Sequence, residues 1–324
     1  MEDFWFVVFE HLESPRDNRE LGLTCKRAYL KLKHREPKLK NCRHLERLLR
    51  LFPNLPWDFY SLSTNPGLNI GIVKNRSYKS WSYCGLSRNP GITWKDVQEN
   101  PNLTWHYHSL SENPNITWDI VQRNPGKGWE YNTLSCNPNV TWDIIQQNPD
   151  MNWSYYGLSR NPNITWAIVQ QNPDADWDFV ELSKHKCVTW DIIQQNPDKD
   201  WNWNWMSCNP NITWDIIQKN PDKDWNYSYL SKHPNITWDI IQQNPDKPWD
   251  YYCVLQSPNV DWAIFQQNFA LFNDKCNKLE LNCIHAFSLN PNLTWEVVYK
   301  YADLDWSWSH ISMNSFNFEK LKRK

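Results

Sequence analysis

The sequence predicts an all-α protein, an α-solenoid of about ten 24-residue helix-turn-helix repeats behind a small helical N-terminal module. Two observations carry this prediction: Trp recurs with a fixed period, and each half of the period has its own helix start and stop signals. The composition agrees, with 23 Trp and 21 Pro among 324 residues but only 8 Gly. So many Trp and Pro indicate short elements, each anchored by a large side chain and ended by Pro.

Two interleaved Trp series define the repeat. The first contains nine Trp in steps of 24, at 57, 81, 105, 129, 153, 177, 201, 225 and 249. The second contains eight, at 94, 118, 142, 166, 190, 214, 238 and 262. The next member is Trp295, so nine residues are inserted near 268–281, and Trp306 then resumes the frame.

The half-unit around the second series, half A, reads N-I-T-W-D-I-I-Q-K-N-P at 211–221. Thr before the Trp is a good helix N-cap, and Asp after the Trp suits the positive end of the helix dipole. Asn-Pro then ends the helix. The half-unit around the first series, half B, reads D-W-N-Y-S-Y-L-S-K-H-P at 224–234, with an aromatic residue two positions after each Trp. We interpret both as two-turn helices that pair into an αα-hairpin.

A β-solenoid is the alternative. Ile212, Trp214 and Ile216 alternate as in a strand, and a 24-residue period is compatible with β-helical repeats. The Thr caps, the adjacent Ile pairs and the scarcity of Gly favour helices.

Stacked layers 9–10 Å apart predict a rod or arc of roughly 90–100 Å whose two ends carry caps. Ile70 and Asn282 occupy Trp positions in degenerate half-units near the ends, and residues 315–324 are expected to close the last layer. The near-constant Gln of half A is expected to form a hydrogen-bonded ladder, at 122, 146, 170, 194, 218 and 242.

This pattern divides the chain into three parts. Residues 1–52 form the helical module, residues 53–312 form the solenoid with its insertion, and residues 313–324 form a basic C-terminal cap or tail.

Charge argues against nucleic acid as a partner. Residues 57–318 hold 18 Lys and Arg against 27 Asp and Glu, so the repeat region lacks the basic footprint of phosphate binding. The N-terminus does not resemble a signal peptide, and no apolar run is long enough for a membrane span. The nine Cys include no CxxC pair, which indicates reduced thiols and no zinc site.

Catalytic and cofactor motifs are absent from the sequence. There is no HExxH, phosphate loop or GxSxG, and the repeated Asp residues recur once per layer, as caps do. We therefore expect a non-enzymatic protein without cofactor or metal, which binds other proteins.

Comparison of the repeats with one another points to candidate partner-binding residues. In half B, the third and fourth positions after the Trp vary most, which is expected of residues that face solvent. Exposed aromatic side chains make good anchors for a partner. The candidates are Tyr60, His108, Tyr156, Glu181, Trp205, Tyr229 and Tyr252. The alternative is an unconstrained surface.

The N-terminal pattern VVFEHLESPRDNRELGLTCKRAY resembles an F-box, although it lacks the usual initial Leu-Pro. The resemblance implies docking onto the adaptor subunit of a cullin-type ubiquitin ligase through Leu12, Leu21, Leu23 and Cys25. The plain alternative is a helical cap on the solenoid.

The repeat, with the consensus NPNITWDIIQQNPDKDW and the copy NPNITWDIIQKNPDKDW at 209–225, resembles the Trp-rich repeats of proteins from giant amoeba-infecting DNA viruses, over about residues 53–312. That resemblance implies a viral origin and action in the host cytoplasm, with the nucleus as a further place. Two functions follow as hypotheses: a substrate receptor that links a target to a host ubiquitin ligase, or a structural, virion-associated repeat protein.

Overall fold

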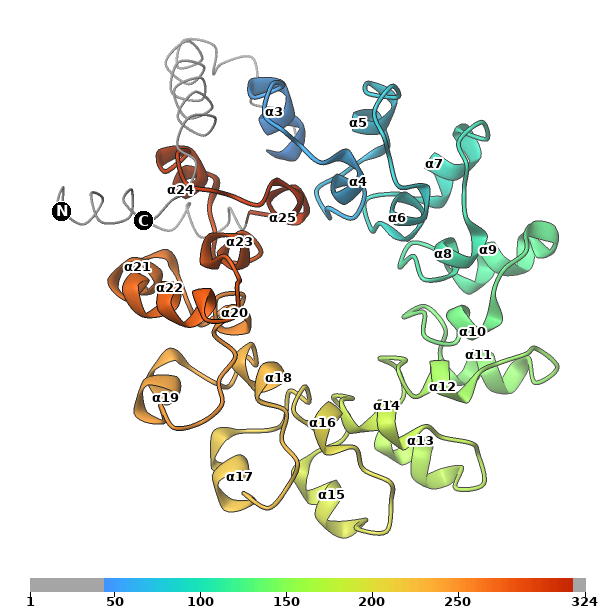
Figure 1. Ribbon diagram of the computed structural model, residues 1–324. Helices are drawn as coiled ribbons and strands as arrows, with labels where there is room; N and C mark the ends of the chain where they lie inside the picture. The colour runs from blue at the N-terminus through green and yellow to red at the C-terminus, as the bar shows by residue number, and fades with distance from the viewer. Residues whose placement is uncertain (1–43, 317–324) are drawn as a thin grey trace.

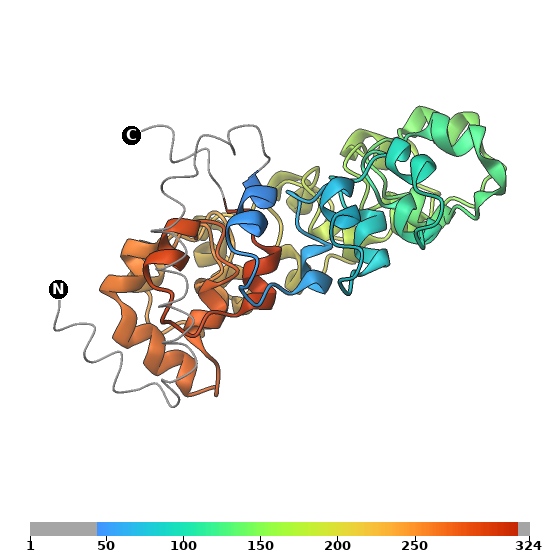
Figure 2. The same ribbon diagram turned by 90° about the horizontal axis from the view of Figure 1, so that it is seen from above.

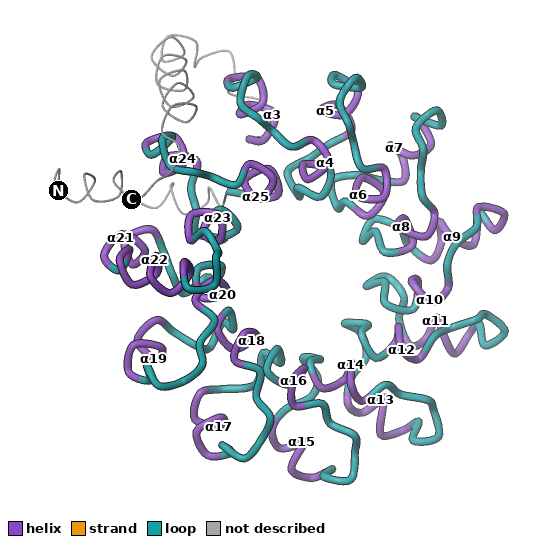
Figure 3. Tube along the Cα trace, viewed as in Figure 1, coloured by secondary structure: helices purple, strands orange, loops and turns teal. Residues whose placement is uncertain are grey.

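The computed structural model describes residues 44–316, and within them the chain is all-helical, which confirms the predicted α-solenoid. Short helices joined by loops follow one another around a closed ring, and the described residues contain no strand (Figures 1 and 3). The β-solenoid alternative is therefore wrong.

Eleven helix pairs make up the ring, each with an outer helix on the periphery and an inner helix around the central opening (Figure 1). The outer helices come from half A: α3 His44–Leu51, α5 Ile70–Lys74, α7 Trp94–Glu99, α9 Trp118–Arg123, α11 Trp142–Gln147, α13 Trp166–Gln171, α15 Trp190–Gln195, α17 Trp214–Lys219, α19 Trp238–Gln243, α21 Trp262–Gln267 and α24 Trp295–Lys300. The inner helices come from half B: α4 Phe59–Leu62, α6 Tyr83–Arg88, α8 Tyr107–Ser111, α10 Tyr131–Leu134, α12 Tyr155–Leu158, α14 Phe179–Ser183, α16 Trp203–Met206, α18 Tyr227–Ser231, α20 Tyr251–Val254, α23 Cys283–Phe287 and α25 Trp308–Met313.

The expected caps start these helices. Thr117 is the N-cap of α9, and its side chain accepts a hydrogen bond from the backbone N–H of Ile120. Thr141, Thr213 and Thr237 do the same for α11, α17 and α19. The side chain thus satisfies one of the backbone donors that a helix start leaves free.

Trp ties the two halves of each unit together. The indole Nε1 of Trp105 donates to the Asn100 carbonyl five residues earlier at 2.9 Å, and the other nine half-B Trp of the described chain repeat this bond. The rings also pack on each other between units, as for Trp118 and Trp153, whose centroids are 5.3 Å apart with their planes at 47°. Each half-B indole therefore packs its apolar surface against its neighbours while its one donor stays paired.

Asn and Ser side chains join each inner helix to the next. The amide Nδ2 of Asn137 donates to the carbonyls of Ser111 and Asn113 in the preceding unit, at 2.8 and 3.1 Å. The Ser111 hydroxyl accepts from the backbone N–H of Glu130 at 3.1 Å. Such an Asn occurs at eight joints, at positions 65, 89, 113, 137, 161, 209, 290 and 314. The ladder is thus built from Asn. The expected Gln ladder is wrong, because those Gln are exposed on the outer helices.

The ring closes through the same joint, between α25 and α4 (Figure 2). The Asn65 amide donates to the Ser312 and Asn314 carbonyls at 2.7 and 3.0 Å, and the Asp58 N–H donates to the Ser312 hydroxyl at 3.0 Å. Trp57 stacks on Trp295, with centroids 5.6 Å apart. The predicted open rod with two capped ends is therefore wrong: the last unit stacks on the first.

Two segments differ from the predicted boundaries. Helix α3, which the sequence analysis placed in the N-terminal module, is the first outer helix, and its Leu48 and Leu49 are buried in the common core. At the other end, Phe316 is 2% exposed and packs edge-on against Trp295, so this part of the predicted tail also belongs to the ring.

The inserted residues form an additional helix, α22 Phe269–Asn277, beside α21 (Figure 1). Phe272 of this helix is fully buried and packs on Trp238 at 5.0 Å and on Tyr251 at 6.2 Å. Half-B Trp residues make these two contacts elsewhere, as Trp249 does with Trp214 and Tyr227. Phe272 therefore replaces the Trp that the tenth unit lacks.

The closed ring predicts that Asn65→Ala destabilises the protein as much as Asn137→Ala does. Each substitution removes three side-chain hydrogen bonds and leaves at least one buried carbonyl unpaired, at a cost of about 2–3 kcal/mol in the free energy of unfolding. Urea denaturation measures both values. A neutral Asn65→Ala beside a destabilising Asn137→Ala would show that the ring is open in solution.

His185 and His233 replace the ladder Asn at two joints and predict a loss of stability in acid. Each Nε2 lies within 3.0 Å of a carbonyl of the preceding unit, and each Nδ1 faces a backbone N–H, so the neutral Nε2–H tautomer fits. Burial lowers the pKa of both imidazoles below the usual 6.5.

Because the folded pKa is depressed, the unfolded chain takes up protons first as the pH falls, and the free energy of unfolding decreases below about pH 6.5. His185→Asn/His233→Asn restores the common ladder residue and should flatten this dependence between pH 7.5 and 5.5. Urea denaturation of both proteins at the two pH values measures it. Equal slopes would exclude the two imidazoles as its source.

Candidate interaction surface

The inner helices carry a row of exposed side chains around the opening of the ring. This row, which we call the wall row, consists of the third residue after each half-B Trp position. Each of the eleven units contributes one residue to it. All are exposed or half-exposed: Tyr60, Cys84, His108, Asn132, Tyr156, Val180, Asn204, Ser228, Tyr252, His285 and Ser309. The neighbouring positions that join the units are buried and nearly constant, whereas this row carries apolar, polar and aromatic residues alike.

Four of the predicted partner-binding residues lie in the wall row. Tyr60 is 65% exposed and Tyr156 is 52% exposed, and His108 is exposed as well. Tyr252 is only half-exposed. These side chains share one register position on neighbouring or distant units, so a partner inside the ring could contact several of them.

The other three candidates, at the fourth position after the Trp, lie between adjacent inner helices. Trp205 and Tyr229 are half-buried and stack on each other, with ring centroids 5.4 Å apart and planes 18° apart. Glu181 is only 5% exposed, so its predicted place on the surface is wrong. Small residues at the fourth position pack against the preceding unit, as at Gly157, where a Cβ would lie 2.5 Å from the Asn132 carbonyl oxygen, and most units carry Gly, Ala, Ser or Thr there.

The sequence comparison missed a second exposed row, the seventh residue after each half-B Trp position. It includes Arg88, Arg160, Lys184 and Lys232. The sequence spacing could have predicted this second row, because residues three and seven positions after the Trp are four apart and so share one face of a short helix.

The predicted adaptor-binding residues Leu12, Leu21, Leu23 and Cys25 lie outside the described residues.

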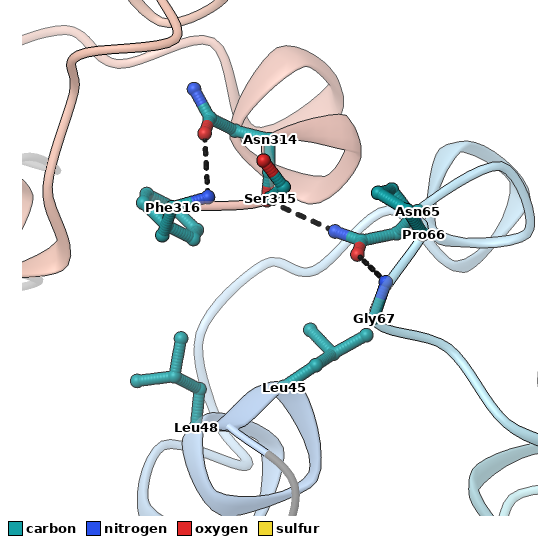
Figure 4. A pocket seen from close by; sticks show the side chains of 8 residues that line it. All are labelled: Leu45, Leu48, Asn65, Pro66, Gly67, Asn314, Ser315 and Phe316. Carbon is teal, nitrogen blue, oxygen red and sulfur yellow. Dashed lines mark hydrogen bonds between the residues drawn. The ribbon is translucent and has the colours of Figure 1, made fainter. Parts of the chain in front are cut away.

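A cavity of about 150 Å³ lies at the joint that closes the ring, between α3 and the turn after α25 (Figure 4). Leu45, Leu48 and Phe316 form its apolar side, and the Asn65 and Asn314 amides border it while engaged in ladder bonds. Gly67 borders it where most units carry an Asn, and a Cβ there would lie 3.3 Å from the Leu45 Cβ. We interpret the cavity as a packing gap between α3 and this turn.

The buried cysteine thiols of the described residues are poor nucleophiles. Burial raises the pKa of the Cys253 thiol to about 11 and that of Cys283 to about 12, so neither is an activated nucleophile. Residues 44–316 contain no group of three His, Cys, Asp or Glu that could hold a metal ion. No helix in this part of the chain has the length and apolar character to cross a membrane.

Comparisons with known proteins found no matching family model, no matching curated protein and no matching solved structure.

Proposed function

We propose that this chain is a non-enzymatic scaffold that binds other proteins along the inside of its ring. The observation that supports the proposal is the separation of two kinds of position on the same inner helices. The Ser, Asn and aliphatic residues that stack the units are buried and repeat from unit to unit, whereas the wall row is exposed or half-exposed and holds six residue types in its eleven units.

Exposed Tyr side chains in the wall row supply the anchors. Tyr60 and Tyr156 offer large amphipathic surfaces that lose little conformational entropy when bound, which makes such residues frequent binding hot spots. Three of the outer helices, α11, α15 and α19, instead share one sequence, WDIIQQ, and so present the same Gln and Asp residues. No such repetition is found in the wall row of the inner helices.

The scaffold proposal predicts that Tyr60→Ser/Tyr156→Ser/Tyr252→Ser loses partners that the native ring retains. The immobilised proteins are incubated with cell lysate, and the retained proteins are quantified by mass spectrometry. Gln146→Ala/Gln194→Ala/Gln242→Ala, on the outer helices, is the matched control and should keep them. If only the control loses partners, the binding surface is the outside of the ring.

The resemblance to an F-box adds a second proposal, that residues 12–25 recruit a cullin-ligase adaptor in the host cytoplasm and the ring holds the target. Closure of the ring supports this over a capping role. The joint between α25 and α4 gives both end units a neighbour, so the array has no open end that a cap would need to cover.

This second proposal predicts micromolar or tighter binding of the full chain to purified adaptor, measured by calorimetric titration. Leu12→Asp/Leu23→Asp should abolish it while circular dichroism stays native. Absence of binding by the folded native chain, together with abundance in purified virus particles, would instead support the structural, virion-associated role.

A further inference from the structure

Three cations follow one another along the inner wall between α12 and α18. Arg160, Lys184 and Lys232 all occupy the seventh position after the half-B Trp, in the fifth, sixth and eighth units. Each lies over an aromatic ring: Arg160 at 5.7 Å from Tyr156, Lys184 at 4.1 Å from Trp205 and Lys232 at 5.7 Å from Tyr229. We call these three cations and three rings the basic arc.

A buried carboxylate holds two of these cations in place. Glu181 Oε2 lies 2.8 Å from Lys184 Nζ and 3.5 Å from Arg160 Nε, and its side chain is 6% exposed. The Arg160 side chain remains 47% exposed and that of Lys184 28% exposed. The single anion therefore fixes two cations from adjacent units while leaving N–H donors of both accessible to a ligand.

The Trp205 ring of the arc is already covered, whereas Tyr156 stays 52% exposed. Trp205 has Lys184 of the preceding unit over it and Tyr229 of the following unit stacked on it. Because these neighbours come from opposite sides along the ring, neither face of the indole is open to a nucleobase, and base stacking is what single-stranded nucleic acid needs. Around Trp205, the groups left to a partner are the cations, which suit carboxylates.

We propose that the basic arc binds an acidic, extended segment of a protein partner; this inference rests on the scaffold function proposed above. The charge pattern favours it, since the arc presents three cations against one buried carboxylate. Units packed about 8–10 Å apart match about three residues of extended chain per unit. Cations on the fifth, sixth and eighth units thus match carboxylates at positions i, i+3 and i+9.

The test is fluorescence polarisation of the full chain with a labelled, Gly- and Ser-based peptide of about twelve residues that carries Glu at its first, fourth and tenth positions. Lys184→Glu/Lys232→Glu should weaken binding about a hundredfold, roughly tenfold for each reversed charge. Arg88→Glu is the matched control, because Arg88 holds the same register position on α6, outside the arc. It should bind the peptide like the native chain.

Three outcomes would overturn the inference. One is no binding of the Glu peptide, and another is equal binding of a peptide with Gln in place of Glu. The third is tighter binding of labelled oligo-dT, which would make the arc a nucleic-acid site. If the peptide fails but the Tyr60→Ser/Tyr156→Ser/Tyr252→Ser variant still loses its partners, the scaffold stands and only the acidic specificity is wrong.

Discussion

Each inner helix is too short to satisfy its own backbone, and this constraint shapes the whole molecule. Helix α10 has four residues, and its Tyr131, Thr133 and Leu134 carbonyls accept from backbone N–H groups of the turn that follows. The Asn161 amide of the following unit donates in turn to the Ser135 and Asn137 carbonyls of that turn. A unit at an open end would lack this neighbour. Closure between α25 and α4 removes that defect, because every unit then has a neighbour on both sides.

The sequence predicted the local structure well, because local signals are repeated many times. The 24-residue period, the Thr caps and the all-helical class are read directly from residues such as Thr117 and Trp118. The ring itself could not be predicted, since it depends on a small rotation at each joint that no single residue encodes. The part played by α3 was missed because Glu46 stands where the outer helix would carry its Trp. Phe272 was missed because it comes from the insertion, outside the repeat frame.

The candidate surface was predicted in part for a related reason. Variation between repeats identified both the third and the fourth positions after the Trp, yet only the third is exposed or half-exposed in every unit. At the fourth position, variation reflects what each pair of neighbours has room for, as with the Trp205–Tyr229 stack and the buried Glu181. Variation at a position therefore shows that the repeat pattern does not fix its residue type. Whether that residue is exposed depends on how the adjacent unit packs against it.

Closure of the ring also restricts the number of repeats that the protein can gain or lose in evolution. An open solenoid can gain or lose a unit by duplication or deletion, since each copy touches only its neighbours. Here each of the eleven pairs supplies one eleventh of a full turn, so adding or removing 24 residues would require every remaining joint to adopt a new angle or the ring to part at one of them. The nine-residue insertion was acceptable because α22 lies beside α21 and adds no joint. We therefore expect lineages of this protein to conserve their repeat number while diverging freely in insertions on the outside of the ring.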